Sequence, residues 1–323
     1  MTLLHRNPTL AFAAVLGVFS LTPRLPGQAA PTGSLVRDRI YSEVGGQTLQ
    51  LDLALPSEPP AGGRFPAVLY FHGGGWQSGR RQEVHEQIQL LAAKGFVGIA
   101  VSYRLAPDHK WPAQIHDAKT AVRFVRTHAA EFNIDPDRIA AAGESAGGHL
   151  ALMLGLTSPD DDLEGPGEWS DVSSRVQSVV SYSALVDFTK LKFNRPPEEL
   201  TPEETRRLAA SDAHHQMQHG KTTAEVLADW TGTADPADPI WKDISPVQYV
   251  SRGDAPVLII QGDGDPVVPV EQGRLLNRML TAAAVRHDLL IIEGAGSSLT
   301  QAQATRAATR MVEFLRLTLP APR

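Results

Sequence analysis

Short apolar runs alternate with longer segments of helical spacing along most of this chain. The apolar runs, such as 66–71 and 255–261, have the length and composition of buried strands. The segments between them, such as 112–130, repeat apolar residues every three to four positions, which is typical of amphipathic helices. Strands that alternate with helices build a mostly parallel sheet covered on both faces. We therefore expect an α/β fold with about eight strands.

The pattern assigns most of the chain to individual elements. The expected strands are two within 36–55, followed by 66–71, 96–103, 137–142, 176–182, 255–261 and 289–293. The expected helices are 82–94, 112–130, 146–156, 270–284 and 301–317. Residues 189–243 interrupt the alternation, and a polar helix begins there at Thr201-Pro202-Glu203-Glu204, which has the pattern of a capping box. We expect 189–243 to form a small helical cap inserted over the sheet.

Composition excludes several classes of function. The chain has 323 residues, of which 42% are hydrophobic and 20% charged, as in an ordinary globular domain. The net charge is -6 and no cluster of Lys and Arg occurs, so we expect no nucleic-acid partner. There are no cysteines, which excludes disulfides, thiolate zinc sites and a cysteine nucleophile.

The first thirty residues have the character of a targeting segment. His5 and Arg6 precede an apolar run from Leu10 to Leu21, which is too short to span a bilayer comfortably. Small residues near Ala29 and Ala30 offer a cleavage point. We expect 1–30 to be a signal peptide, with an uncleaved N-terminal anchor as the alternative, and 31–323 to be the mature domain, secreted or periplasmic. No other stretch is apolar for long enough to cross a membrane, so we expect no integral membrane domain.

A first chemical motif is Gly-Glu-Ser-Ala-Gly at 143–147, between an expected strand and an expected helix. This context is the one in which G-x-S-x-G forms a sharp turn that exposes the hydroxyl of its serine above the sheet. A plain glycine-rich entry to a helix is the alternative. The flanking elements favour Ser145 as a nucleophile.

A second motif is His-Gly-Gly-Gly-Trp at 72–76, directly after the expected strand 66–71. Glycines let a backbone approach a substrate carbonyl closely, and their N–H groups can stabilise the negative charge that develops on its oxygen. A simple glycine turn is the alternative. Two such motifs in this order make coincidence a poor explanation.

Together with several further stretches, these motifs resemble the hormone-sensitive-lipase-like and bacterial feruloyl/acetylxylan-esterase-like branch of the α/β-hydrolases, over residues 36–318. The further stretches are Tyr103-Arg104-Leu105-Ala106-Pro107, Trp111-Pro112, Asp117, Ser245-Pro246 and the turn 262–269.

The resemblance implies an α/β-hydrolase fold and a set of site residues. It implies Ser145 as the nucleophile and Asp265 as the acid of a catalytic triad, with Asp263 the less favoured acid. It implies an oxyanion hole formed by the backbone N–H groups of Gly74, Gly75 and Ala146. It implies no cofactor and no metal, and a small-molecule ester or acid as ligand.

The chain departs from the family pattern at the histidine that should follow the last strand. The turn there reads Glu-Gly-Ala-Gly-Ser-Ser at 293–298, and Ser297 stands in the place of the histidine. A serine hydroxyl needs a base to become nucleophilic, and Ser297 cannot supply one at neutral pH. Loss of a triad histidine can cost about a million-fold in turnover and leave roughly 10³–10⁴-fold over water.

No other histidine is an obvious replacement. His287 lies at the far end of the last strand, more than about 20 Å from residue 297 at strand spacing. His149 is expected to be packed in its helix, and His72 to brace the glycine turn. The expected cap contains His214, His215 and His219. One of them reaching over Ser145 as a base stays an alternative. We expect no zinc there, because no carboxylate completes a set of metal ligands.

Two functions therefore stay open. One is a serine carboxylic-ester hydrolase for short-chain or aromatic acyl esters, attenuated by the missing histidine. The other is a catalytically inactive binding protein on the same scaffold, as in the plant gibberellin receptors. A third interpretation is that Ser297 is not the natural residue. The sequence does not fix the oligomeric state.

Overall fold

A single eight-stranded sheet forms the centre of the computed structural model, which describes residues 33–58, 63–191, 197–296 and 298–319. The strand order is β1-β2-β4-β3-β5-β6-β7-β8. The pairs β1–β2 and β2–β4 are antiparallel and all the others are parallel, which confirms the expected mostly parallel sheet. The strands are β1 Leu35–Val44, β2 Gln47–Ala54, β3 Phe65–Phe71, β4 Val97–Val101, β5 Ile134–Glu144, β6 Ser178–Tyr182, β7 Val257–Gly262 and β8 His287–Ile292.

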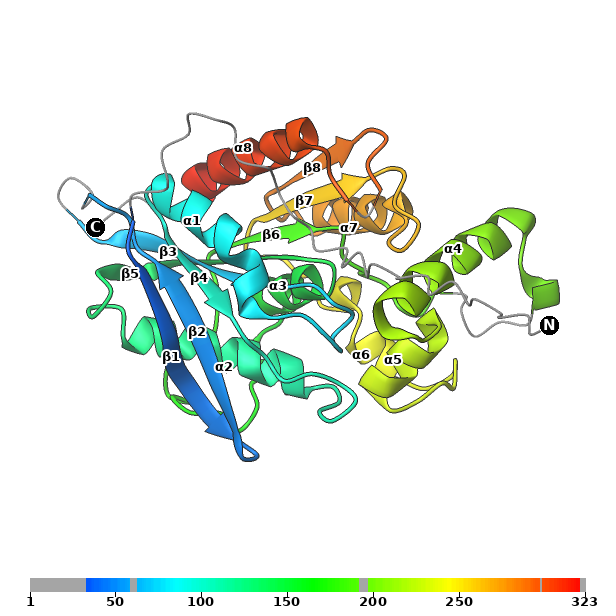
Figure 1. Cartoon of the computed structure of the whole chain (residues 1–323), viewed down its shortest axis with the longest axis horizontal. Helices are drawn as coiled ribbons and strands as arrows, with labels where there is room; N and C mark the ends of the chain where they lie inside the picture. Colours follow the sequence, from blue (N-terminus) through cyan, green and yellow to red (C-terminus); the bar gives the residue numbers. More distant parts are fainter. Residues whose placement is uncertain (1–32, 59–62, 192–196, 297, 320–323) are drawn as a thin grey trace, which may run out of the picture.

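Helices cover both faces of this sheet (Figure 1). On one face α2 (Ala113–Thr127), α3 (Ala146–Leu156) and α7 (Val270–Ala282) pack on the strands over one large apolar cluster. On the other face α1 (His85–Ala93) and α8 (Gln301–Thr318) pack over a second cluster. Because side chains alternate along a strand, β3 sends Leu69 to the first cluster and Tyr70 to the second. Both faces are thus buried, as a parallel sheet requires.

Several element boundaries differ from those expected. The strand expected at 137–142 begins earlier, because Ile134 already pairs with Phe65 of β3. The helix expected at 82–94 is divided into a short 3-10 turn, η1 (Arg81–Val84), and α1. In that turn the buried Arg81 forms an ion pair with Asp52, at 3.0 Å between Nε and Oδ1.

The chain between β6 and β7 forms helices that lie beyond the carboxyl ends of these strands (Figure 1). They are α4 (Pro202–His219), α5 (Thr223–Thr231) and α6 (Ile240–Asp243), with short turns η3 (Pro197–Glu199) and η4 (Pro246–Gln248) on either side. The expected capping box is present: Thr201 accepts a hydrogen bond from the N–H of Glu204, whose side chain accepts one from the N–H of Thr201. We call this helical insertion the cap.

Two of the sequence-based expectations fall on residues that the structure does not describe. The signal peptide predicted at 1–30 and residue 297 both lie outside the described residues. Within the described ranges, no helix has the length and apolar character needed to cross a membrane.

Candidate active site

Ser145 occupies a strained turn between β5 and α3. Its backbone angles are φ 51° and ψ −118°, in a region that non-glycine residues rarely adopt. Its N–H donates to the carbonyl of Tyr182 on the neighbouring strand β6, at 2.8 Å. The strand-turn-helix context predicted for the Gly-Glu-Ser-Ala-Gly motif is therefore present, and it places the hydroxyl of Ser145 at the wall of a cavity.

The glycines that flank Ser145 permit this turn by close backbone packing. A Cβ on Gly147 would lie 2.1 Å from the carbonyl oxygen of Phe71, at the end of β3. A Cβ on Gly143 would lie 2.4 Å from the carbonyl oxygen of Gly147. Any larger residue at either position would force β3, β5 and α3 apart.

The glycine turn, residues 72–76 after β3, meets the turn that holds Ser145. A Cβ built on Gly73 would lie 3.6 Å from the Cβ of Ser145, so the two motifs are in contact. Gly74 and Gly75 both have positive φ, 108° and 59°, which glycine adopts without steric cost. This arrangement is compatible with the predicted oxyanion hole, whose other predicted donor is the N–H of Ala146 at the start of α3.

His72 packs against the glycine turn and supports it, in agreement with the expectation from the sequence. Its ring stacks on Tyr103 with centroids 4.3 Å apart, and its Nδ1 lies 2.8 Å from the carbonyl oxygen of Gly73. The hydroxyl of Tyr103 donates to the carbonyl of His72 at 2.8 Å. Burial lowers the pKa of His72 to about 4, so this imidazole is neutral near pH 7 and serves as a brace.

The cap is fastened to the glycine turn by an aromatic stack. Trp76, which ends the motif, stacks on Trp230 of α5, with ring centroids 3.7 Å apart and planes 1° apart. The side-chain amide of Gln77 donates to the carbonyl of Val226 on the same helix at 2.7 Å. Trp76 and Trp230 belong to a third apolar cluster, which also contains Phe188 and joins the cap to the sheet. The position of the glycine turn thus depends on α5.

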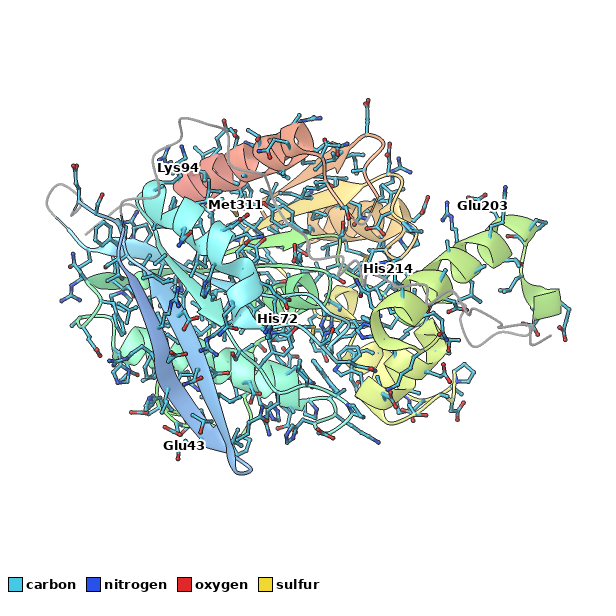
Figure 2. The ribbon with its side chains drawn as sticks, in the orientation of Figure 1. Glu43, His72, Lys94, Glu203, His214 and Met311 are labelled. Atoms are coloured by element: carbon cyan, nitrogen blue, oxygen red, sulfur yellow. The ribbon has the colours of Figure 1, made fainter. Side chains whose placement is uncertain are left out.

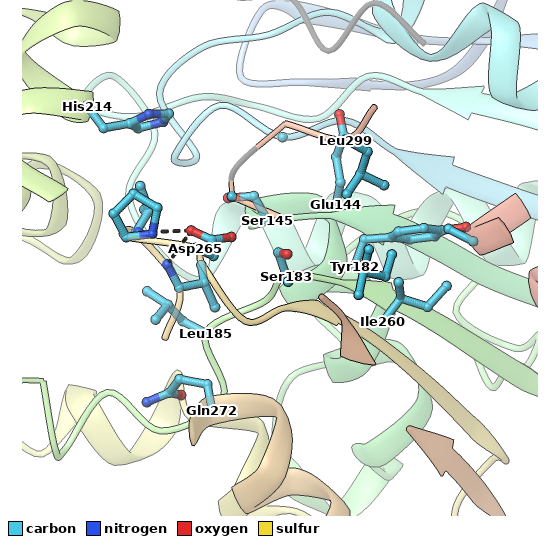
Figure 3. Close-up of a pocket in the computed structure, with 18 of the residues that line it drawn as sticks. Glu144, Ser145, Tyr182, Ser183, Leu185, His214, Ile260, Asp265, Gln272 and Leu299 are labelled. Atoms are coloured by element: carbon cyan, nitrogen blue, oxygen red, sulfur yellow. Dashed lines mark hydrogen bonds between the residues drawn. The ribbon is translucent and has the colours of Figure 1, made fainter. Parts of the chain in front are cut away.

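Asp265 lies in the turn after β7, buried at the edge of the cavity (Figure 3). Its Oδ1 accepts hydrogen bonds from the N–H groups of Val267 and Val268, at 2.9 and 3.0 Å. Burial raises the pKa of Asp265, and the hydrogen bonds from Val268, Val267 and the hydroxyl of Ser183 oppose that rise. The carboxyl is therefore held in a fixed orientation, as an acid that orients a base must be.

The neighbouring carboxylate, Asp263, has a different part in the structure. It is exposed, and its Oδ1 accepts the N–H of Gly294 at 2.7 Å. Gly264 donates to the carbonyl of Ala295 at 2.9 Å, so the turn after β7 and the start of the turn after β8 lie side by side. This geometry supports the preference for Asp265 over Asp263 as the predicted acid.

No histidine in the described ranges forms a hydrogen bond with Ser145 or Asp265. His149 is fully buried in α3, where its Nε2 lies 2.8 Å from the carbonyl oxygen of Ile244, and burial lowers its pKa to about 4. His214 of α4 lines the cavity and projects toward the body of the protein (Figure 2), and the charge of Asp265 counteracts part of the lowering of its pKa by burial. The predicted replacement of the histidine by Ser297 stays a prediction from sequence.

Sequence reasoning missed two polar residues of the cavity wall. Ser183 follows β6 with φ 43°, its hydroxyl counteracts part of the rise in the pKa of Asp265, and no sequence signal marks it. Glu144 fills the variable second position of the Gly-x-Ser-x-Gly motif, and its place beside Ser145 is a usable sequence signal. Both residues lie around the cavity with Ser145 in Figure 3.

The cavity itself has a volume of about 1580 Å³. This exceeds the roughly 300–1,000 Å³ of common small-molecule sites. It extends from the cap, past Ser145, to the groove between α1 and α8, where Leu90, Tyr182 and Met311 line it. In the described part of the chain no three His, Asp or Glu side chains gather to hold a metal ion. The expectations of no metal and no cofactor stay predictions.

Comparison with known proteins gives consistent matches. The sequence profile of the BD-FAE family matches residues 51–280. Probable carboxylic ester hydrolase LipM of Mycobacterium tuberculosis is 30% identical over 304 residues, which are 90% of this chain and 65% of LipM. The chain spans less than two thirds of the length of the curated relatives LipM, LipC and LipQ.

Solved structures agree with these sequence matches. A truncated carbohydrate esterase from gut microbiota aligns with a TM-score of 0.73 at 28% identity, covering 90% of this chain and 98% of the other. The butyrate-bound esterase Est2 of Thermogutta terrifontis aligns with a TM-score of 0.69 at 27% identity, covering 91% and 97%.

Proposed function

The chain belongs to the BD-FAE family of α/β-hydrolases, and on that premise we propose that it hydrolyses carboxylic esters with Ser145 as its nucleophile. The observation that carries the proposal is the contact between the glycine turn and the strained turn of Ser145. This contact supports the proposed oxyanion hole, because the glycine turn adjoins the residue whose hydroxyl would attack a carbonyl carbon. The resemblance to esterases in sequence and structure supports the same chemistry.

The reaction proceeds in two acyl-transfer steps. The Oγ of Ser145 attacks the ester carbonyl, and the N–H groups of Gly74, Gly75 and Ala146 stabilise the oxyanion. The alcohol then leaves and an acyl-serine is formed, which water hydrolyses to the free acid. In the absence of the usual histidine, we expect the rate to be low.

The substrates we propose are short-chain or aromatic acyl esters. Est2 has been solved with butyrate and with propionate, and the gut-microbiota relative is a carbohydrate esterase. The cavity of about 1580 Å³ leaves room for a large alcohol portion beside a small acyl group. Esters that decorate a polysaccharide fit these two properties.

The test compares hydrolysis of a short chromogenic ester by the natural chain and its Ser145→Ala and Ser297→His variants. We expect Ser145-dependent turnover by the natural chain, and a gain of several orders of magnitude in Ser297→His. Equal rates for the natural chain and Ser297→His would refute the placement of the missing histidine. Paraoxon, which phosphorylates Est2, is a second probe of Ser145.

A second candidate is a ligand-binding protein without turnover. It is favoured by one observation: in the described ranges no imidazole is hydrogen-bonded to Ser145. In that case the natural chain and Ser145→Ala would hydrolyse the ester equally slowly, and a short carboxylic acid would still bind in calorimetry. Ser145-dependent turnover would rule this candidate out.

We also propose that residues 1–30 direct export. The proposal rests on the sequence pattern of that segment. Expression of the full chain in a bacterium, followed by fractionation and N-terminal sequencing, would show a new terminus near residue 30 in the exported fraction. Retention of the full-length chain in the cytoplasm would contradict export.

A further inference from the structure

Glu144 is a carboxylate next to the nucleophile that has no part in the predicted triad. It is the last residue of β5, and alternation along the strand puts its side chain on the same face as Ala140 and Ala142, toward α1 and α8. It lines the same cavity as Ser145. In the part of the chain that the structure describes, its carboxyl has no hydrogen-bond or ion-pair partner.

Glu144 is buried near three tyrosines, and the charge that most affects it is the carboxylate of Glu83. Burial raises the pKa of Glu144 to about 7, and the neighbouring Glu83 adds to the rise. Tyr70, Tyr103 and Tyr182 interact electrostatically with it, and burial keeps these phenols neutral. Other charged groups line the cavity from α1 and α8, namely Glu86, Lys94, Glu313 and Arg316. A carboxylate in this setting holds a proton far better than one in water.

We propose that Glu144 accepts the proton of Ser145 through one bridging water, in place of the histidine that the sequence lacks. The inference rests on the proposed esterase function. Three observations carry it: Glu144 adjoins Ser145, it faces the same cavity, and its carboxyl is unpartnered. General bases act either directly or through one water, and the cavity has room for that water.

The proton balance is the following. As Ser145 Oγ bonds to the ester carbon, its proton passes to the water, and a proton of that water passes to the Glu144 carboxylate. When the tetrahedral intermediate collapses, the bond to the alcohol oxygen breaks and the proton returns through the water to the leaving alkoxide. In the second half, a water bonds to the acyl carbon and gives its proton to Glu144. The bond from that carbon to Ser145 Oγ then breaks, the free acid leaves, and Glu144 returns the proton to Oγ.

The cap histidine His214 is the competing acceptor. It faces the cavity from α4, and the charge that acts on it is that of Asp265. Glu144 is anchored at the end of β5, one residue from Ser145.

The decisive experiment is a double-mutant cycle of Glu144→Gln and Ser297→His, measured as Ser145-dependent ester hydrolysis. We expect Glu144→Gln to lower kcat about 100-fold in the natural chain, at the lower end of general-base effects. In the Ser297→His background we expect a loss of less than about fivefold, because histidine then takes the proton. Activity in that background also shows that the Glu144→Gln chain folds.

A pH profile separates a proton-transfer role from a structural one. The natural chain should lose activity below about pH 7, as the Glu144 carboxylate becomes protonated. Glu83→Gln removes a negative charge near Glu144, so it should move this midpoint to lower pH. Glu43→Gln, on the exposed end of β1, is the matched control and should leave the midpoint unchanged.

The outcomes are distinct. Equal losses from Glu144→Gln in both backgrounds, or no loss in a natural chain that hydrolyses the ester, overturn the role of Glu144 and leave the esterase function standing. A loss with His214→Gln but not with Glu144→Gln assigns the proton to the cap and also overturns it. If the natural chain has no Ser145-dependent turnover while Ser297→His does, the proposed function itself fails, and the role of Glu144 with it.

Discussion

Trp230 in the cap and Trp76 after the glycine turn are stacked in parallel, with ring centroids 3.7 Å apart. The indole N–H of Trp230 donates to the side chain of Gln114 at 3.1 Å, and the carbonyl of Trp230 accepts the N–H of Trp111 at 2.9 Å. One cap residue thus holds the glycine turn and the loop before α2 together. Activity should therefore be sensitive to a residue that does not line the cavity.

Trp230→Ala should cost about 3–5 kcal/mol in the free energy of unfolding, because the residue is fully buried. It should also reduce kcat/KM of the remaining folded protein, since the glycine turn loses its support. Trp169→Ala is the control: this tryptophan stacks on Phe124, away from the cavity, and should affect stability without a comparable effect on kcat/KM. Urea unfolding and initial rates measure the two effects, and an unchanged kcat/KM in Trp230→Ala would contradict the coupling.

Gly147→Ala should be strongly destabilising, because its Cβ would lie 2.1 Å from a backbone oxygen of β3. We expect a loss of about 1–3 kcal/mol or more, together with slower labelling of Ser145 by paraoxon. Gly45→Ala is the matched control, since its Cβ would meet nothing within 4 Å and would incur only the cost of a left-handed backbone, about 1–2 kcal/mol. Normal labelling of a folded Gly147→Ala chain would argue against the required close approach.

Glu144→Gln should stabilise the protein at alkaline pH. The pKa of Glu144 is about 7 in the folded state against about 4.5 in the unfolded chain, so the folded state retains a proton that the unfolded state releases. Stability is therefore lost as pH rises from 4.5 through 7, by at most about 3 kcal/mol. The variant lacks this loss. Its free energy of unfolding, measured with urea, should equal that of the natural chain at pH 4 and exceed it by about 1–3 kcal/mol at pH 8.

His149→Gln should weaken the acid sensitivity of the fold. Because burial lowers the pKa of His149 to about 4, the unfolded chain takes up a proton below pH 6.5 that the folded chain does not bind. This lowers the free energy of unfolding as pH falls from 6.5 to 4, by at most about 3 kcal/mol. The variant loses packing at every pH, so its free energy of unfolding should be below that of the natural chain. In urea unfolding this difference should become smaller as the pH is lowered from 7 to 4.5.

Much of the fold followed from local patterns. Alternating apolar runs predicted the eight strands, and the Thr201 capping box predicted the start of α4. These signals are local in the chain, because period and capping chemistry depend on nearest neighbours. The start of β5 was missed, since Ile134 is extended only through its pairing with Phe65, which is distant in sequence.

The site was predictable where it rests on backbone geometry and less so where it rests on tertiary contacts. The turns at 72–76 and 143–147 are recognisable because only glycine tolerates their conformations and close approaches. Ser183 could not be found, since its effect on Asp265 depends on the ends of two strands that meet only in the folded sheet. The setting of Glu144 could not be predicted either, since the groups around it come from η1, α1 and α8, which are distant in sequence.

The dependence of the glycine turn on α5 limits how relatives on this scaffold can diversify. Close backbone contacts at glycines hold β3, β5 and α3 together, so substitutions at these contacts should be poorly tolerated. A cap exchanged by recombination would have to supply its own aromatic partner for Trp76, or the glycine turn with its predicted oxyanion-hole amides would lose its support. Sequence changes that alter substrate choice should therefore concentrate in α4, which lines the same cavity but does not support the glycine turn.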